Sequence, residues 1–164
     1  MQLAGLALAS AVLFLIACGG SEGNGAAQAA TDSTTSIVQS PAVAGGSVAA
    51  SPITGTIHEV KMLGDAQGYR FDPATIVAKP GDGIKFIMTT GGPHNVSFDA
   101  ATIPADQKDQ LFANMPNQAD GGSPMLMNPN ETWTLSLGNL KPGKYPFHCT
   151  PHFAMNMKGE ISVE

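Results

Sequence analysis

The chain has 164 residues, of which 43% are hydrophobic, 13% charged and 6% aromatic. This length suits one globular domain rather than two. Eight basic residues against thirteen acidic ones give a formal charge of −5, and no basic cluster is present that could follow a phosphate backbone. The composition therefore argues against nucleic-acid binding.

The chain begins with an apolar run at residues 3–17 that contains a single serine. A helix that crosses a bilayer needs about 20 apolar residues, whereas the shorter run is typical of a secretory signal. The run ends in Leu15-Ile16-Ala17-Cys18, which resembles the lipidation box of bacterial lipoproteins. The resemblance implies a signal peptide at residues 1–17 and a lipidated Cys18 as membrane anchor. The alternative is an uncleaved hydrophobic tail, because no Lys or Arg precedes the run.

Residues 18–52 are rich in Gly, Ala, Ser and Thr and contain no aromatic residue. This composition predicts a flexible linker. A random coil of this length has a root-mean-square reach of roughly 30 Å. The linker would therefore hold a small domain away from a membrane surface.

The remaining residues, 53–164, contain all eight basic residues and every aromatic residue except Phe14. Short runs of apolar and β-branched residues, separated by Gly and Pro, predict seven strands. They cover residues 56–63, 73–78, 84–89, 95–98, 132–137, 144–149 and 159–163. So many short strands in one domain predict an all-β sandwich. Residues 101–127 do not alternate, and we expect there a long excursion with one helical turn near residues 106–112.

The chain has two cysteines, Cys18 and Cys149. A bridge between them would tie the flexible linker to a predicted core strand. We therefore expect two separate roles for the cysteines and no disulfide.

A cluster of metal-ligand residue types begins at Cys149. His152 lies three positions later, Met155 and Met157 follow, and His94 stands in an upstream segment. One Cys, two His and a weak axial Met form the ligand set of a blue copper electron-transfer site, because soft sulfur suits Cu(I) and imidazole suits either oxidation state. The residue types thus predict copper. A Cys/His zinc site is the alternative, but zinc would have no use for the thioether.

The arrangement also resembles a known family. Cys149, His152 and Met157 have the spacing Cys-x2-His-x4-Met, and together with Pro93-His94-Asn95-Val96 they resemble the plastocyanin and pseudoazurin group of cupredoxins. The similarity covers nearly all of residues 69–164, through Phe71-Asp72-Pro73, Ile76-Val77-Ala78, Pro80-Gly81-Asp82, Phe98-Asp99 and Leu140-Lys141-Pro142-Gly143-Lys144-Tyr145. The resemblance implies a Greek-key β-sandwich that holds one type 1 copper through His94, Cys149, His152 and Met157.

Counting alone leaves the axial ligand open. Met155 gives Cys-x2-His-x2-Met, the shorter spacing of amicyanin-like proteins. Resemblance to the pseudoazurin loop, in which the second methionine binds, favours Met157.

Two further residues are expected to support the site. Asn95 follows His94, and the resemblance implies a side-chain hydrogen bond from Asn95 to the loop between Cys149 and His152; the alternative is a turn-forming asparagine. Pro151 has no N–H, so it cannot donate a hydrogen bond near the thiolate. Fewer hydrogen bonds to the sulfur raise the reduction potential.

His148 is a separate case. Strand alternation places it on the face opposite Cys149, Phe147 and Tyr145, so we do not expect it to bind the same copper. A His-Cys pair also resembles the bridge of copper nitrite reductases, but that bridge needs at least two more histidines and only His58 is unassigned. The simpler interpretation is an exposed strand histidine on an electron path.

An acidic segment is the remaining feature of the predicted excursion. Asp99, Asp106, Asp109 and Asp120 face a single basic residue, Lys108. The segment is either a docking surface for a basic partner or an ordinary solvated loop.

We therefore predict a one-electron carrier rather than an enzyme. It would cycle copper between Cu(II) and Cu(I), act as a monomer, and exchange electrons with larger redox proteins. Its expected location is the periplasmic or extracellular face of a bacterial membrane, with Cys18 as the anchor. The alternatives are a copper chaperone or storage protein, and a subunit of a copper oxidoreductase such as nitrite reductase.

Overall fold

The computed structural model describes residues 48–164. The predicted signal peptide, Cys18 and most of the predicted linker lie outside the described residues. Within the described part, no helix combines the length and the hydropathy needed to cross a bilayer.

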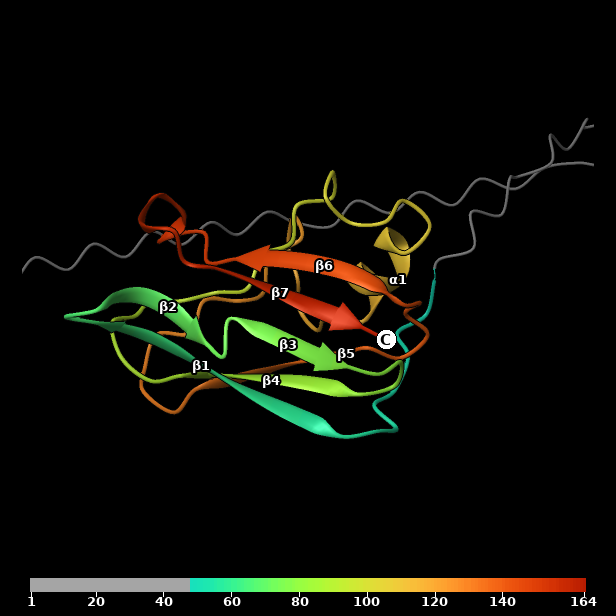
Figure 1. Cartoon of the computed structure of the whole chain (residues 1–164), viewed down its shortest axis with the longest axis horizontal. Helices are drawn as coiled ribbons and strands as arrows, with labels where there is room; N and C mark the ends of the chain where they lie inside the picture. Colours follow the sequence, from blue (N-terminus) through green and yellow to red (C-terminus); the bar gives the residue numbers. More distant parts are fainter. Residues whose placement is uncertain (1–47) are drawn as a thin grey trace, which may run out of the picture. The chain divides into compact units, whose positions relative to one another are not determined.

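Two β-sheets pack face to face (Figure 1). The first sheet has the strand order β2-β1-β4-β5, and the second has the order β3-β7-β6. The strands are β1 (Ile57–Asp65), β2 (Gly68–Asp72), β3 (Thr75–Ala78), β4 (Gly83–Met88), β5 (Thr132–Ser136), β6 (Gly143–His148) and β7 (Lys158–Val163). The predicted β-sandwich is confirmed.

Strands distant in the chain lie next to each other in both sheets. β1 pairs in parallel with β4, and β3 pairs in parallel with β7, while the other neighbours are antiparallel. Parallel neighbours cannot be joined by a tight hairpin, so the chain crosses between the sheets. These crossings bring the segment after β4 close to the segment after β6.

The core lies between the sheets and is rich in aromatic residues. In β4, alternate residues Ile84, Phe86 and Met88 are buried, as expected for a strand with one core face. Phe147 packs edge-to-face against Phe71 and Phe86, with ring centroids 4.7 Å and 5.4 Å apart. Such contacts rigidify the core from which the strands extend toward the ligand residues.

The strand predictions were wrong in two places. β2 was missed because only Phe71 is buried in it, which leaves no alternation to detect. Residues 95–98 were predicted as a strand, but they lie outside all named strands. Ser97 instead forms single bridges with Gly122 on one side and with His148 on the other. The segment is divided between two partners and therefore builds no regular ladder.

The predicted excursion contains the expected helical turn as α1 (Lys108–Ala113). Asn114 caps the C-terminus of the helix, and its side-chain amide donates to the carbonyls of Ser136 and Gly138 at 3.1 Å and 2.7 Å. Its amide oxygen accepts from the backbone N–H of Ser51 at 2.8 Å. These bonds join the start of the described chain to the end of the sandwich where β4 begins.

Candidate metal centre

The candidate ligands converge from two segments at one end of the sandwich, which we call the ligand end. β4 ends at Met88, and the chain then reaches His94. β6 ends at His148, and Cys149 follows it directly. His152 precedes the short 3-10 helix η1 (Phe153–Met155), and Met157 precedes β7. Backbone bonds between Ser97 and His148 hold the two segments together.

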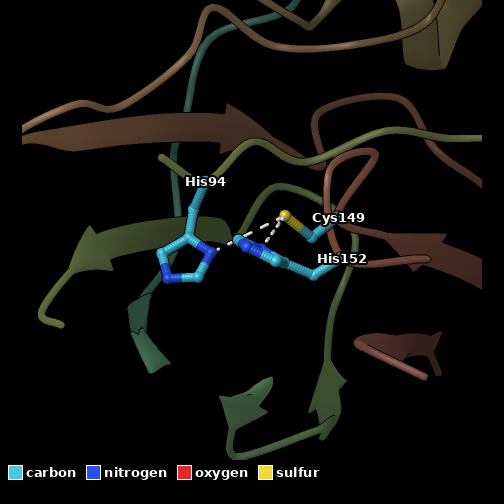
Figure 2. A group of neighbouring side chains, drawn as sticks. All are labelled: His94, Cys149 and His152. Atoms are coloured by element: carbon cyan, nitrogen blue, oxygen red, sulfur yellow. Dashed lines mark hydrogen bonds between the residues drawn. The ribbon is translucent and has the colours of Figure 1, made fainter. Parts of the chain in front are cut away.

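Three of the predicted ligands lie in contact (Figure 2). The Cys149 Sγ atom is 3.6 Å from Nδ1 of His94 and 3.4 Å from Nδ1 of His152. All three potential ligand atoms lie within 4.8 Å of one another, and all three residues are buried. In Figure 2 both imidazole rings turn a nitrogen toward the sulfur. The arrangement fits a single ion that all three residues share.

The orientation of His94 selects the atom that is free to bind. Its Nε2 lies 2.9 Å from the carbonyl oxygen of Thr90. A carbonyl can only accept, so Nε2 carries the proton and donates. Nδ1 therefore keeps its lone pair, directed toward Cys149, and the carbonyl also holds the ring in position.

Burial sets the protonation of the site. Burial lowers the pKa of His94 and that of His152. The neighbouring His94 lowers the pKa of His152 further. Burial raises the pKa of the Cys149 thiol, although hydrogen bonds from Asn95 and His152 oppose this. Neutral imidazoles are ready to bind a metal. The thiol must lose its proton, so metal binding is coupled to proton release.

The two methionines differ in their surroundings. Met157 is fully buried, whereas Met155 is 54% exposed. The backbone N–H of Cys149 donates to the Met157 carbonyl at 3.0 Å. A buried thioether on a residue whose backbone is bonded to that of Cys149 suits a weak axial ligand. The burial favours Met157, in line with the sequence prediction.

Asn95 braces the loop that carries Cys149. Its side-chain oxygen accepts from the Thr150 N–H at 2.8 Å, and its amide donates to the Thr150 hydroxyl at 3.2 Å. Pro151 is exposed at the tip of this loop. Having no N–H, Pro151 adds no donor there.

Sequence reasoning missed Tyr69 in β2. Its ring stacks on the His152 ring, with centroids 3.8 Å apart and planes inclined by 13°. No local spacing relates these two residues. The stacking depends on a strand that shows no alternation and therefore had no detectable signal.

His148 lies away from the site, as strand alternation predicted. Tyr145, Phe147 and Cys149 are buried, while His148 lies on the other face of β6 and is half-buried rather than exposed as expected. Its ring packs against Phe153, with centroids 4.8 Å apart.

A lysine from outside the acidic segment partly neutralises its charge. Asp106 forms a 2.7 Å ion pair with Lys141, in addition to the local approach of Lys108 to Asp109 at 4.0 Å. The expectation that these carboxylates face only Lys108 was therefore wrong. Lys141 lies in the turn before β6, and only the fold brings it to Asp106.

The comparison with protein families matches residues 58–164 to the copper binding proteins of the plastocyanin/azurin family. The chain belongs to this family. A plastocyanin from Prochlorothrix hollandica is 31% identical over 117 residues, covering 71% of this chain and 80% of that protein. A chloroplastic plastocyanin from Chlamydomonas reinhardtii is 33% identical over 125 residues, covering 74% of this chain and 79% of that protein.

The fold agrees with this assignment. The oxidised form of plastocyanin from Dryopteris crassirhizoma matches with a TM-score of 0.53 and 28% identity, covering 65% of this chain and 100% of that chain. Membership of the plastocyanin/azurin family, together with the buried His94, Cys149 and His152, identifies the cofactor as one type 1 copper. The chain is accordingly a copper electron carrier rather than an enzyme.

Proposed function

We propose that this carrier cycles its copper between Cu(II) and Cu(I) outside the cytoplasm, tethered to a membrane through Cys18. The observation that carries the proposal is the buried group of His94, Cys149 and His152, with the Met157 side chain buried nearby. Two imidazoles, one thiolate and one thioether suit both oxidation states of copper.

The protein's contribution is to hold these donors in one arrangement. Bound copper supplies the one-electron redox change. The Thr90 carbonyl orients His94, and Asn95 holds the backbone next to Cys149. Ligands that are already braced need to move little when the charge at the site changes, which favours rapid electron transfer over substrate chemistry.

His152 is the only one of the four expected ligands with any exposed surface. It is 7% exposed, whereas His94, Cys149 and Met157 are fully buried. Phe153 and Met155, which follow it in the loop, are both more than half exposed. Exposed apolar side chains beside a site of function indicate a contact surface. We propose that larger redox proteins, as donor and acceptor, dock here.

The distribution of histidines supports a carrier over a nitrite reductase subunit. The chain has four histidines, all in the described part. His94 and His152 belong to the ligand group, His58 is hydrogen-bonded to Asp82 at 2.9 Å, and His148 packs on Phe153. This leaves no histidine pair for a second, catalytic copper. The buried thiol also argues against a storage protein or chaperone, which must release copper readily.

The start of the domain is compatible with a tether. Ser51 is hydrogen-bonded to Asn114, and Thr54 to the Gly81 carbonyl at 2.9 Å, both at the end of the sandwich opposite the ligand end. A chain that leaves the domain at residue 48 starts from that opposite end. Residue 48 therefore lies away from the surface around His152.

Copper loading tests the carrier. One Cu(II) per chain should give an intense visible absorption from Cys149 sulfur-to-copper charge transfer, and the protein should be reduced and reoxidised reversibly by one electron. A colourless complex, or copper that dissociates on reduction, would refute the proposal and favour a storage protein or chaperone.

Membrane fractionation of the full chain tests the tether. Cys18→Ala should move the protein out of the membrane fraction and leave the copper spectrum unchanged. Stable anchoring needs more than one acyl chain, since each buried CH₂ contributes about 0.8 kcal/mol. If the variant stays membrane-bound after a high-salt wash, the uncleaved hydrophobic tail replaces the lipid anchor.

A further inference from the structure

Ser97 contacts the residues on both sides of Cys149. Its backbone N–H donates to the His148 carbonyl at 2.8 Å, and its carbonyl accepts from the His148 N–H at 2.9 Å. Its hydroxyl lies 2.8 Å from the Thr150 hydroxyl. One residue of the His94 segment thus brackets the cysteine from before and after.

The Ser97 hydroxyl also closes a ring of hydrogen bonds. The Asn95 amide donates to Ser97 Oγ at 3.0 Å and to Thr150 Oγ1 at 3.2 Å, while Asn95 Oδ1 accepts from the Thr150 N–H at 2.8 Å. Asn95 follows His94, and Thr150 follows Cys149. The ring therefore links the two ligand-bearing segments directly.

Removing the Ser97 hydroxyl would leave the Asn95 amide short of a hydrogen-bond acceptor. Thr150 is exposed, but Asn95 is 4% exposed and Ser97 is 8% exposed, so the hydrogen bond between Asn95 and Ser97 is buried. Without Ser97 Oγ, one amide hydrogen of Asn95 has no partner, which is costly in a buried place. Asn95 would turn to recover one, and its two bonds to Thr150 would shift with it.

The long excursion packs onto this ring. A Cβ atom at Gly122 would lie 2.8 Å from Ser97 Oγ and 3.4 Å from Asn95 Nδ2. Gly122 pairs with Ser97 as an isolated bridge. Only a residue without a side chain allows this approach, so the excursion confines the Ser97 hydroxyl where Thr150 meets it.

We propose that Ser97 is a positioning residue of the copper site, which fixes Cys149 Sγ relative to His94 Nδ1 through Asn95 and Thr150. The inference rests on the proposed function. It assigns to Ser97 the task of holding the sulfur in place before and after each change of oxidation state. Residues that orient metal ligands in this way typically contribute about 10- to 100-fold to metal affinity.

Ser123 offers a matched control for a Ser97→Ala variant. It is also a serine, 7% exposed, and its hydroxyl accepts from the Val96 N–H and donates to the Pro124 carbonyl. It has no hydrogen bond to the loop of residues 149–157. Ser97→Ala and Ser123→Ala each remove one buried hydroxyl, but only Ser97→Ala breaks the ring of hydrogen bonds.

Copper binding separates the two variants. Ser97→Ala should lower Cu(II) affinity by about 10-fold in a competition titration and shift the charge-transfer band. Ser123→Ala should lower thermal stability and leave affinity and band unchanged. Thr150→Val removes the other hydroxyl of the ring, and its effect should be less than additive with that of Ser97→Ala, since the two share one interaction.

Amide hydrogen exchange of the metal-free protein gives a second readout. Ser97→Ala should speed exchange at the Thr150 N–H several-fold more than Ser123→Ala does. If the two serine variants match in affinity, band and exchange, Ser97 has a structural role only and the inference is overturned. Failure of the wild-type protein to bind copper would instead refute the proposed function, and the exchange measurement would still decide the role of Ser97.

Discussion

The two ends of the sandwich place their histidines in different surroundings. At the ligand end, His94 and His152 lie against the Cys149 sulfur, and each is buried. At the opposite end, the partly exposed His58 meets the Asp82 carboxylate at 2.9 Å. Uncharged, buried surroundings favour a neutral imidazole whose lone pair can bind a metal, whereas the His58 ring is engaged in a hydrogen bond with the carboxylate. The surroundings, and not the residue type, decide which end can take a metal.

The pKa shifts follow the same division. Burial lowers the pKa of both ligand-end histidines. At the opposite end, the hydrogen bond from His58, followed by one from the Lys79 N–H, lowers the pKa of Asp82 to about 2. The ligand end thus maintains lone pairs for a cation, and at the opposite end the His58–Asp82 hydrogen bond ties the start of β1 to the turn before β4.

The largest effect should come from removing the sulfur. Cys149→Ser should abolish the intense visible band of the copper-loaded protein, because the charge transfer originates on the thiolate, while circular dichroism shows a folded domain. His58→Gln removes a histidine from the opposite end and should leave the band unchanged. Persistence of the band in Cys149→Ser would mean that another residue supplies the sulfur.

The second effect concerns the two methionines. Met157→Leu should raise the reduction potential, because a lost thioether stabilises Cu(II) less. The swap nearly conserves volume, so it should cost less than about 1.5 kcal/mol in the free energy of unfolding. Met155→Leu alters an exposed side chain and should change neither quantity. Voltammetry of both variants checks this, and a shift confined to Met155→Leu would make Met155 the axial ligand.

The sequence predicted best what is local in the chain. Cys149, His152 and the two methionines lie within nine positions of one another, so spacing alone brought them together as candidates. The β-sandwich followed from alternating strands. Both depend on patterns that are complete within a few residues.

What was missed depends on contacts between distant segments. Tyr69 stacks on His152 from a strand without alternation, and Lys141 pairs with Asp106 from beyond the excursion. Ser97 contacts Thr150 from a segment that was wrongly predicted to be a strand. The parallel pairing of β1 with β4 likewise has no local signature. These features arise only when the sheets pack.

The third effect is confined to the opposite end. The carboxylate of Asp82 accepts from His58 and from the backbone N–H groups of Thr56 and Lys79. Asp82→Ala leaves these donors without their partner and should cost about 1–3 kcal/mol in the free energy of unfolding. The copper band should not change. A shifted band would show that the two ends are coupled.

Acidification should remove the contribution of the Asp82 carboxylate to the free energy of unfolding. A carboxyl with a pKa of about 2 in the folded protein stabilises the fold above its unfolded pKa of about 3.9, and this stabilisation is lost as pH falls from about 4 toward about 2. Unfolding curves of wild type and Asp82→Asn should therefore differ at pH 6 and converge near pH 2. A difference in the free energy of unfolding that stays constant over this range would exclude the ionised Asp82 carboxylate as its cause.

The smallest effect should come from the aromatic ring that covers His152. Tyr69 stacks on His152 at 3.8 Å, and a Cβ atom at Gly64 would lie only 2.6 Å from Tyr69 Cε1, so the tyrosine ring is packed between the two. Tyr69→Leu should cost about 0.5–1.5 kcal/mol beyond the change in buried area, the usual value of an aromatic pair. It should also shift the His152 ring protons in NMR spectra of the metal-free protein, because the ring current is lost. Tyr69→Phe keeps the aromatic ring, so it should neither lower the stability nor shift the His152 ring protons. If Tyr69→Phe matches Tyr69→Leu in both measurements, the hydroxyl rather than the stacked ring supports His152, and the ligand end would resemble the opposite end in depending on a polar partner.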